Sequence, residues 1–229
     1  MLPKGNVLPS TTYEAKRVVC PLGLEVEKIH ACPNDCMLYR GKEYEDLEAC
    51  PVCQASRFKI RRDDPGDVDV EGCRARMRVP AKVMWYFPII PRLKRLFRNK
   101  EHAKMMRWHK EERKEDGMLR HPADGSQWRK IDRTYKHFAD DARNIRFGLS
   151  TDGMNPFGDM SSSHSIWPVT MCMFNLPPWL CLKRKFIIIP VLIQGPKQSG
   201  NDIDVYLKPL VEDLLKLWDD GVPMWDAHN

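Results

Sequence analysis

Four cysteines in the first quarter of this 229-residue chain constrain its fold more than any other feature. They form two short pairs, with three and two residues between their members, and thirteen residues separate the pairs: Cys32, Cys36, Cys50 and Cys53. Such a pair can point both sulfurs at one ion only if the chain between them turns tightly, and Pro33 and Pro51 favour such turns. The pattern therefore predicts a zinc-ribbon-like module in which four thiolates hold one structural Zn2+.

Two alternatives to this ligand set stay open. Four unrelated buried thiols would leave the same residues without a metal. Cys20 or His30 would replace a ligand if one of the four cysteines does not bind.

The composition agrees with intracellular metal-binding cysteines. Hydrophobic residues make up 42% of the chain, enough for one domain of ordinary size. Residues 1–10 lack the apolar core of a signal peptide, and the longest apolar run, Phe186 to Ile193, is far shorter than the roughly 20 residues that span a bilayer. We expect a soluble protein with no membrane contact, in a reducing compartment where disulfides are rare.

Positive charge is concentrated in residues 92–114. This stretch holds ten Lys or Arg and three Glu, a net +7, whereas the whole chain carries +6. It predicts one amphipathic helix beginning at Pro91, with the apolar face Leu93, Leu96, Phe97, Ala103 and Met106. A solvated helix face and a DNA-binding surface both fit, and the residues for phosphate contact would be Arg92, Lys94, Arg95, Arg98, Lys104 and Arg107.

A short strand leads directly into an acidic turn at Asp152. Phe147, Leu149 and Thr151 alternate with small residues, as in a strand over 145–151, and Gly153 follows the aspartate. Asp152 is either part of a structural turn or a carboxylate presented to a metal ion. A similar ambiguity holds for His121 and Asp124, where a rigid turn is favoured over a catalytic pair.

The rest of the chain predicts an α+β domain. Apolar segments 166–175 and 186–193 follow the 145–151 strand through short loops, which indicates an antiparallel β-meander. A helix over 201–218 follows, with Asn201 as its N-cap and Gly221 at its end. Its apolar residues lie on one stripe: Ile203, Tyr206, Leu207, Leu210, Leu214 and Leu217. The predicted organisation is a zinc-ribbon-like module over 1–60, a charged linker over 61–77, a basic helical segment over 78–143 and a strand-bearing domain over 144–229.

Several motifs together resemble, in order, the transposases of plant CACTA (En/Spm) DNA elements. They run through the whole chain and include Cys32 to Cys53, Phe-Pro-Ile-Ile-Pro-Arg (87–92), His121-Pro-Ala-Asp-Gly, Thr151-Asp-Gly-Met-Asn-Pro-Phe-Gly158, Asn175-Leu-Pro-Pro-Trp179 and Asn201-Asp-Ile-Asp-Val-Tyr. The resemblance implies a nuclear enzyme that binds transposon ends and cuts and joins DNA. It implies a ribonuclease H-like (DDE) domain in which three acidic residues hold two Mg2+ ions, with Asp152 as the first acid.

The resemblance leaves the second and third acids unassigned. Asp226 is the single local candidate for the second, and residues 144–229 correspond to the incomplete first half of the domain. We therefore expect this chain alone to be inactive, as a fragment of a longer transposase or a product of a decayed element. Three functions stay open: a transposase part, a DNA-binding remnant that does not cut, and a zinc-stabilised protein-interaction module. A homo-oligomer is compatible with each.

Overall fold

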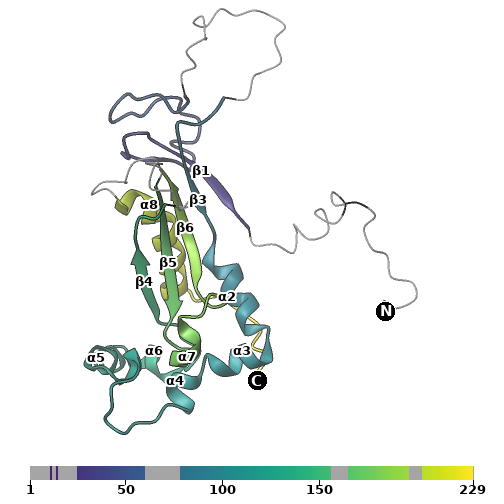
Figure 1. Cartoon of the computed structure of the whole chain (residues 1–229), viewed down its shortest axis with the longest axis vertical. Coiled ribbons are helices and arrows are strands. Elements are labelled where there is room, and N and C mark those ends of the chain that lie inside the picture. The colour runs from purple at the N-terminus through teal and green to yellow at the C-terminus, as the bar shows by residue number, and fades with distance from the viewer. Residues whose placement is uncertain are drawn as a thin grey trace, which may run out of the picture.

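The fold is built on one six-stranded antiparallel sheet with the strand order β2-β1-β3-β6-β5-β4 (Figure 1). It is known from a computed structural model, which describes residues 25–59, 78–155, 165–195 and 203–228, with Thr11 and Glu14. The predicted linker over 61–77, Cys20 and the predicted N-cap Asn201 lie outside these residues.

The strands are β1 (Glu27–Ala31), β2 (Leu38–Tyr39), β3 (Lys82–Tyr86), β4 (Phe147–Thr151), β5 (Ile166–Met173) and β6 (Ile188–Gln194). The helices are α2 (Ile89–Phe97), α3 (Lys100–Met105), α4 (Trp108–Glu111), α5 (Ser126–Thr134), α6 (Lys136–Asp140), α7 (Pro178–Cys181) and α8 (Ile203–Asp219), with a 3-10 turn, η2 (Pro122–Asp124).

The predicted meander is confirmed. β4 pairs with β5, and β5 with β6, both antiparallel. Alternate residues of β5 are buried, namely Val169, Met171 and Met173, which is the period expected of a strand with one face on a core. The mixed α+β class is confirmed with it.

β3 joins the cysteine segment to the meander. On one side it pairs with β1, where Glu27 lies opposite Tyr86, and on the other with β6, where Met84 lies opposite Ile193. The segments predicted as separate modules therefore contribute strands to one sheet. The predicted domain boundaries, near residues 60 and 78, imply that the segments fold independently. This stays a prediction.

α8 packs along one face of the sheet (Figure 1). Tyr206 and Leu210 are fully buried against it, and the remaining members of the predicted apolar stripe belong to the same core: Ile203, Leu207, Leu214 and Leu217. The helix continues through Pro209 and is followed by Gly221, whose φ of +67° suits glycine. The prediction of this helix and its end is confirmed.

The prediction of one long basic helix was wrong. The segment forms three short helices, α2, α3 and α4. The Asn99 side chain accepts a hydrogen bond from the His102 N–H at 3.0 Å and so caps a new helix, because a short amide can satisfy a helix-start donor that a continuous helix would satisfy internally. The predicted apolar residues are nonetheless buried: Leu93, Phe97, Ala103 and Met106 fully, Leu96 partly.

The turn at His121 is structural, as favoured. The His121 side chain accepts from the Ala123 N–H, and Asp124 accepts from the His121 N–H, which makes a reciprocal capping box at η2. Arg113 pairs with Asp124 at 2.7 Å and further fixes the turn.

α8 is also tied to the sheet by a polar contact. The Tyr86 hydroxyl donates to Asp213 of α8 at 2.6 Å, and the Ile89 N–H at the start of α2 donates to the same carboxylate at 3.2 Å. One aspartate thus links β3, α2 and α8.

Replacing Tyr86 by Phe should lower the free energy of unfolding by about 1–2 kcal/mol, because Asp213 loses a hydrogen bond in a buried setting. Chemical denaturation measures this loss. Tyr135→Phe is the matched control, since this tyrosine is 48% exposed, and it should change the free energy by less than about 0.5 kcal/mol. Equal effects of the two substitutions would contradict the linking role.

The stability should also fall steeply in alkali because of Tyr206. Burial, and then the hydrogen bond to Asp35, raises the pKa of Tyr206 above its usual value. Above about pH 10 the unfolded tyrosine ionises while the folded one keeps its proton, so the free energy of unfolding falls by up to about 1.4 kcal/mol per pH unit. Denaturation between pH 10 and 11 should show a shallower fall for Tyr206→Phe than for Tyr135→Phe. Parallel curves would refute the assignment.

Candidate metal centre and the Asp152 strand

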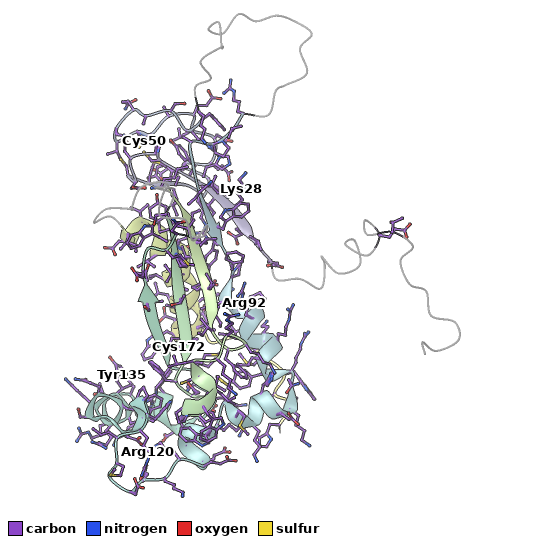
Figure 2. All side chains as sticks on the ribbon, viewed as in Figure 1. Lys28, Cys50, Arg92, Arg120, Tyr135 and Cys172 are labelled. Carbon is purple, nitrogen blue, oxygen red and sulfur yellow. The ribbon has the colours of Figure 1, made fainter. Side chains whose placement is uncertain are left out.

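The four predicted cysteines come together at one end of the sheet (Figure 2 labels Cys50). Their sulfur atoms all lie within 4.8 Å of one another, and Cys32 and Cys50 are buried. Zinc–thiolate bonds of about 2.3 Å place the sulfurs of a tetrahedral site about 3.8 Å apart. The Cys32 and Cys53 sulfurs are 3.4 Å apart, so a small adjustment fits the cluster to one Zn2+ ion.

Two similar turns hold these sulfurs. The Cys32 N–H donates to the Met37 carbonyl, and the Cys50 N–H donates to the Ala55 carbonyl, each at 2.9 Å and each across five residues. Each turn also contains a residue in the left-handed region, Asp35 with φ +62° and Gln54 with φ +59°. The tight turns predicted from the cysteine spacing are therefore present.

His30 is not a substitute ligand in this arrangement. Its Nδ1 atom accepts a hydrogen bond from Arg57 Nε at 2.9 Å, and its ring stacks edge-on against Phe58. The Arg57 guanidinium also lies 4.8 Å from the Tyr39 ring centroid and donates to the Leu47 carbonyl. This arginine thus braces the loop between the two cysteine pairs.

The thiols of the cluster differ in acidity. Hydrogen bonds from the Ala55 backbone and the Asn34 side chain lower the pKa of Cys53 to about 6. Burial raises the pKa of Cys36 to about 12 and also raises that of Cys32. Metal binding requires thiolates, so loading the site releases protons and its affinity falls in acid.

The sequence did not single out Asp35, which attaches the cluster to the rest of the fold. Its carboxylate forms an ion pair with Lys82 of β3 and accepts a hydrogen bond from the Tyr206 hydroxyl of α8. Lys82 and Asp35 are only 9% and 15% exposed. The position of Asp35 inside the first cysteine pair was the available signal, but its partners lie 47 and 171 residues away.

Asp152 lies just beyond the C-terminal end of β4, as predicted, and it is exposed. One of its carboxylate oxygens accepts from the Gly153 N–H at 2.8 Å. A Cβ atom at position 153 would lie 2.6 Å from Trp167 Cζ2, so only glycine permits this close packing of the backbone on the indole. The Trp167 ring therefore fixes the turn that presents Asp152.

The structure does not bring Asp226 to Asp152. Asp226 pairs with Arg107 at 2.6 Å and lines the same cavity as Phe147, at the opposite end of β4. Five strand residues separate these positions by roughly 17 Å. Among the described residues, the four cysteines are the one group of three or more potential metal ligands.

The predicted phosphate-contacting residues lie toward the sheet end opposite Asp152 (Figure 2 shows Arg92 far from Cys50). Arg92 and Arg95 line a groove with Met173, the last residue of β5, and Arg107 pairs with Asp226, which lines the cavity of Phe147. Arg107 is 14% exposed and is taken up by its pair with Asp226. Arg92 is half-buried over the Phe87 ring. Arg95, Arg98 and Lys104 are exposed and Lys94 is partly so, with Lys104 3.2 Å from Glu112.

Comparison with known protein families gives a match, and it includes the segment that contains Asp152. Residues 116–229 match the transposase family tnp2. The match takes in β4, β5, β6 and α8 with Asp152, and it supports a transposase family and a transposase-derived function. The cysteine cluster and α2 to α4 precede the matched segment. No curated protein and no solved structure matches the chain, and none of the helices in the described ranges has the length and apolar character of a membrane span.

The purified protein should contain one zinc ion per chain, measured by elemental analysis. Cys50→Ser should remove it, because a hydroxyl is a poor replacement for a buried thiolate. Cys172→Ser should retain the zinc, since that cysteine is on β5 and outside the cluster. Wild-type protein without metal, or Cys50→Ser with a full complement, would refute the site.

Proposed function

We propose that this chain is the DNA-binding and substrate-positioning part of a CACTA (En/Spm)-type transposase that acts in the nucleus. The observation that carries the proposal is that Asp152, exposed at the end of β4, lies inside the segment that matches the transposase family. The Gly153 N–H holds the Asp152 carboxylate, and Gly153 itself packs on the Trp167 ring. This arrangement supports a role for Asp152 beyond that of a turn residue.

The order of elements supports a ribonuclease H-like domain. Three antiparallel strands, β4 to β6, are followed by the long helix α8, which covers one face of the sheet. The resemblance in sequence implies the same architecture, with Asp152 as the first acid.

Magnesium is the ion that the resemblance implies, and the described residues do not form its site by themselves. Two Mg2+ ions need several hard oxygen ligands, and within the described ranges Asp152 belongs to no group of three or more metal-ligating side chains. Asp152 would supply one carboxylate of that site, and the further acids would come from elsewhere in the complete assembly. The chain by itself would therefore bind DNA without cutting it, and Asp152 would contribute to strand cleavage only within that assembly.

A second candidate is a DNA-binding protein that does not cut. It is favoured because Asp152 is not part of a group of three or more metal-ligating side chains in the portion of the chain that the structure describes. The third candidate, a zinc-stabilised protein-interaction module, would use the cysteine segment and leave the basic residues without a ligand.

A salt series separates the DNA-binding candidates from the third. Without Arg107, which pairs with Asp226, five of the predicted phosphate-contacting residues remain. Five contacts predict a slope of log affinity against log salt of about −4.5, hence a loss of a few hundred-fold between 50 and 200 mM salt. Replacing Lys94, Arg98 and Lys104 by Gln should reduce the slope by nearly 3. The same substitutions at Lys130, Arg133 and Lys136 remove equal charge from exposed positions of α5 and α6 and should leave the slope unchanged.

Duplex affinity that does not depend on salt in the wild-type protein would eliminate both DNA-binding candidates. Salt-dependent binding with equal slopes in the two triple variants would retain DNA binding but remove it from α2 and α3.

Strand cleavage separates the first candidate from the second. An assembly that contains this chain should cut a labelled element-end duplex in Mg2+, and Asp152→Asn should abolish cutting while it preserves the salt-dependent affinity. Binding without cutting by the wild-type assembly would favour the second candidate. Cleavage that survives Asp152→Asn would contradict the metal-ligand role.

A further inference from the structure

A small groove lies where α2 crosses the ends of β5 and β6, and its rim is strongly basic. It has a volume of about 150 Å3. Arg92 and Arg95 enter its lining from α2, and Lys185 enters from the segment before β6, about ninety residues later in the chain. Apolar side chains complete the lining: Leu93, Leu96, Met173, Phe186, Ile187 and Ile188. None of these described lining residues is acidic.

The cations of the groove repel one another. Burial, and then the charge of Arg95, lowers the pKa of Arg92 from its usual value. The Nε atom of Arg92 is buried without a hydrogen-bond partner. A buried guanidinium donor of this kind normally has an acceptor, and an unsatisfied one costs stability.

Lys185 is held close to the same site. Its Nζ atom lies 5.4 Å from the ring centroid of Phe186, which is part of the groove floor. Lys183 and Arg184 precede it, and all three side chains are exposed. Positive charge from two distant parts of the sequence therefore meets at one place.

We propose that this groove binds a phosphate group of the DNA backbone, with Arg92, Arg95 and Lys185 as its donors. An anion there would offset the repulsion between the two arginines. The inference rests on the proposed DNA binding, and it deepens it by adding the 183–185 segment to the contact surface. It also distinguishes Arg92 from Arg107, whose charge is already neutralised by Asp226.

The test compares charge-matched variants in the duplex salt series. Lys185→Gln and Arg92→Gln should each lower the affinity several-fold at 100 mM salt and reduce the slope by about 1. Lys136→Gln and Arg133→Gln remove the same charges from exposed sites on α6 and α5 and should leave both quantities unchanged. Thermal denaturation verifies folding, and Lys185, which is exposed, carries the test if Arg92→Gln does not fold.

The outcomes are distinguishable. If the wild-type protein binds DNA and Lys185→Gln behaves as Lys136→Gln does, the groove is not a phosphate site and the proposed function stands. If the wild-type protein binds no duplex, the proposed function and this inference both fail. Inorganic phosphate tests the remaining source of a phosphate group. Suppose that millimolar phosphate stabilises the wild-type protein but not Lys185→Gln, and that the wild-type protein binds no duplex. The groove would then bind a free anion, and the DNA assignment would be overturned.

Discussion

The pairing of β3 with β1 on one side and β6 on the other is the contact on which the rest of the structure depends. β3 also carries an anchor for α8 at each end: Lys82 shares Asp35 with Tyr206, and Tyr86 bonds to Asp213. On α8 the two anchoring residues, Tyr206 and Asp213, are seven residues or about 10.5 Å apart along the helix axis. On β3 their counterparts, Lys82 and Tyr86, are four residues or about 13 Å apart, so the two spacings are similar. Together they fix the position of the helix along the strand and its rotation about its own axis.

Asp35 explains how a metal-binding loop becomes part of this sheet. Aspartate tolerates the left-handed conformation that the first cysteine turn requires, and its carboxylate is then available to Lys82 and Tyr206. A buried ion pair adds little net stability, but removing one partner leaves an uncompensated charge. The pair therefore specifies where the loop docks more than how tightly it folds, and a metal ion on the four cysteines would strengthen the same docking by ordering the loop.

The local patterns were sufficient to predict the elements but not their assembly. Period-2 alternation predicted β4, two apolar segments predicted β5 and β6, the apolar stripe predicted α8, and the Pro-bearing cysteine pairs predicted the two turns. The pairing of β3 with β1 and β6, and the ion pair of Arg107 with Asp226, join residues far apart in the sequence, so no local pattern indicates them. The prediction of a single long helix was wrong for a local reason, because the Asn99 side chain caps a new helix and so competes with continuation of the first one.

The basic groove and Asp152 lie at different levels of the sheet, and this sets the direction of a duplex that contacts both. The groove on α2 lies level with Met173, which pairs with Phe147, whereas Asp152 follows Thr151, which pairs with Val169. Five strand residues separate Phe147 from Asp152 by roughly 17 Å, which is about five base-pair steps of B-DNA at 3.4 Å each. A duplex that touches both must run along the sheet. The groove would then hold the backbone well away from the scissile phosphate, so its arginines and lysine would position DNA and take no part in the chemistry proposed at Asp152.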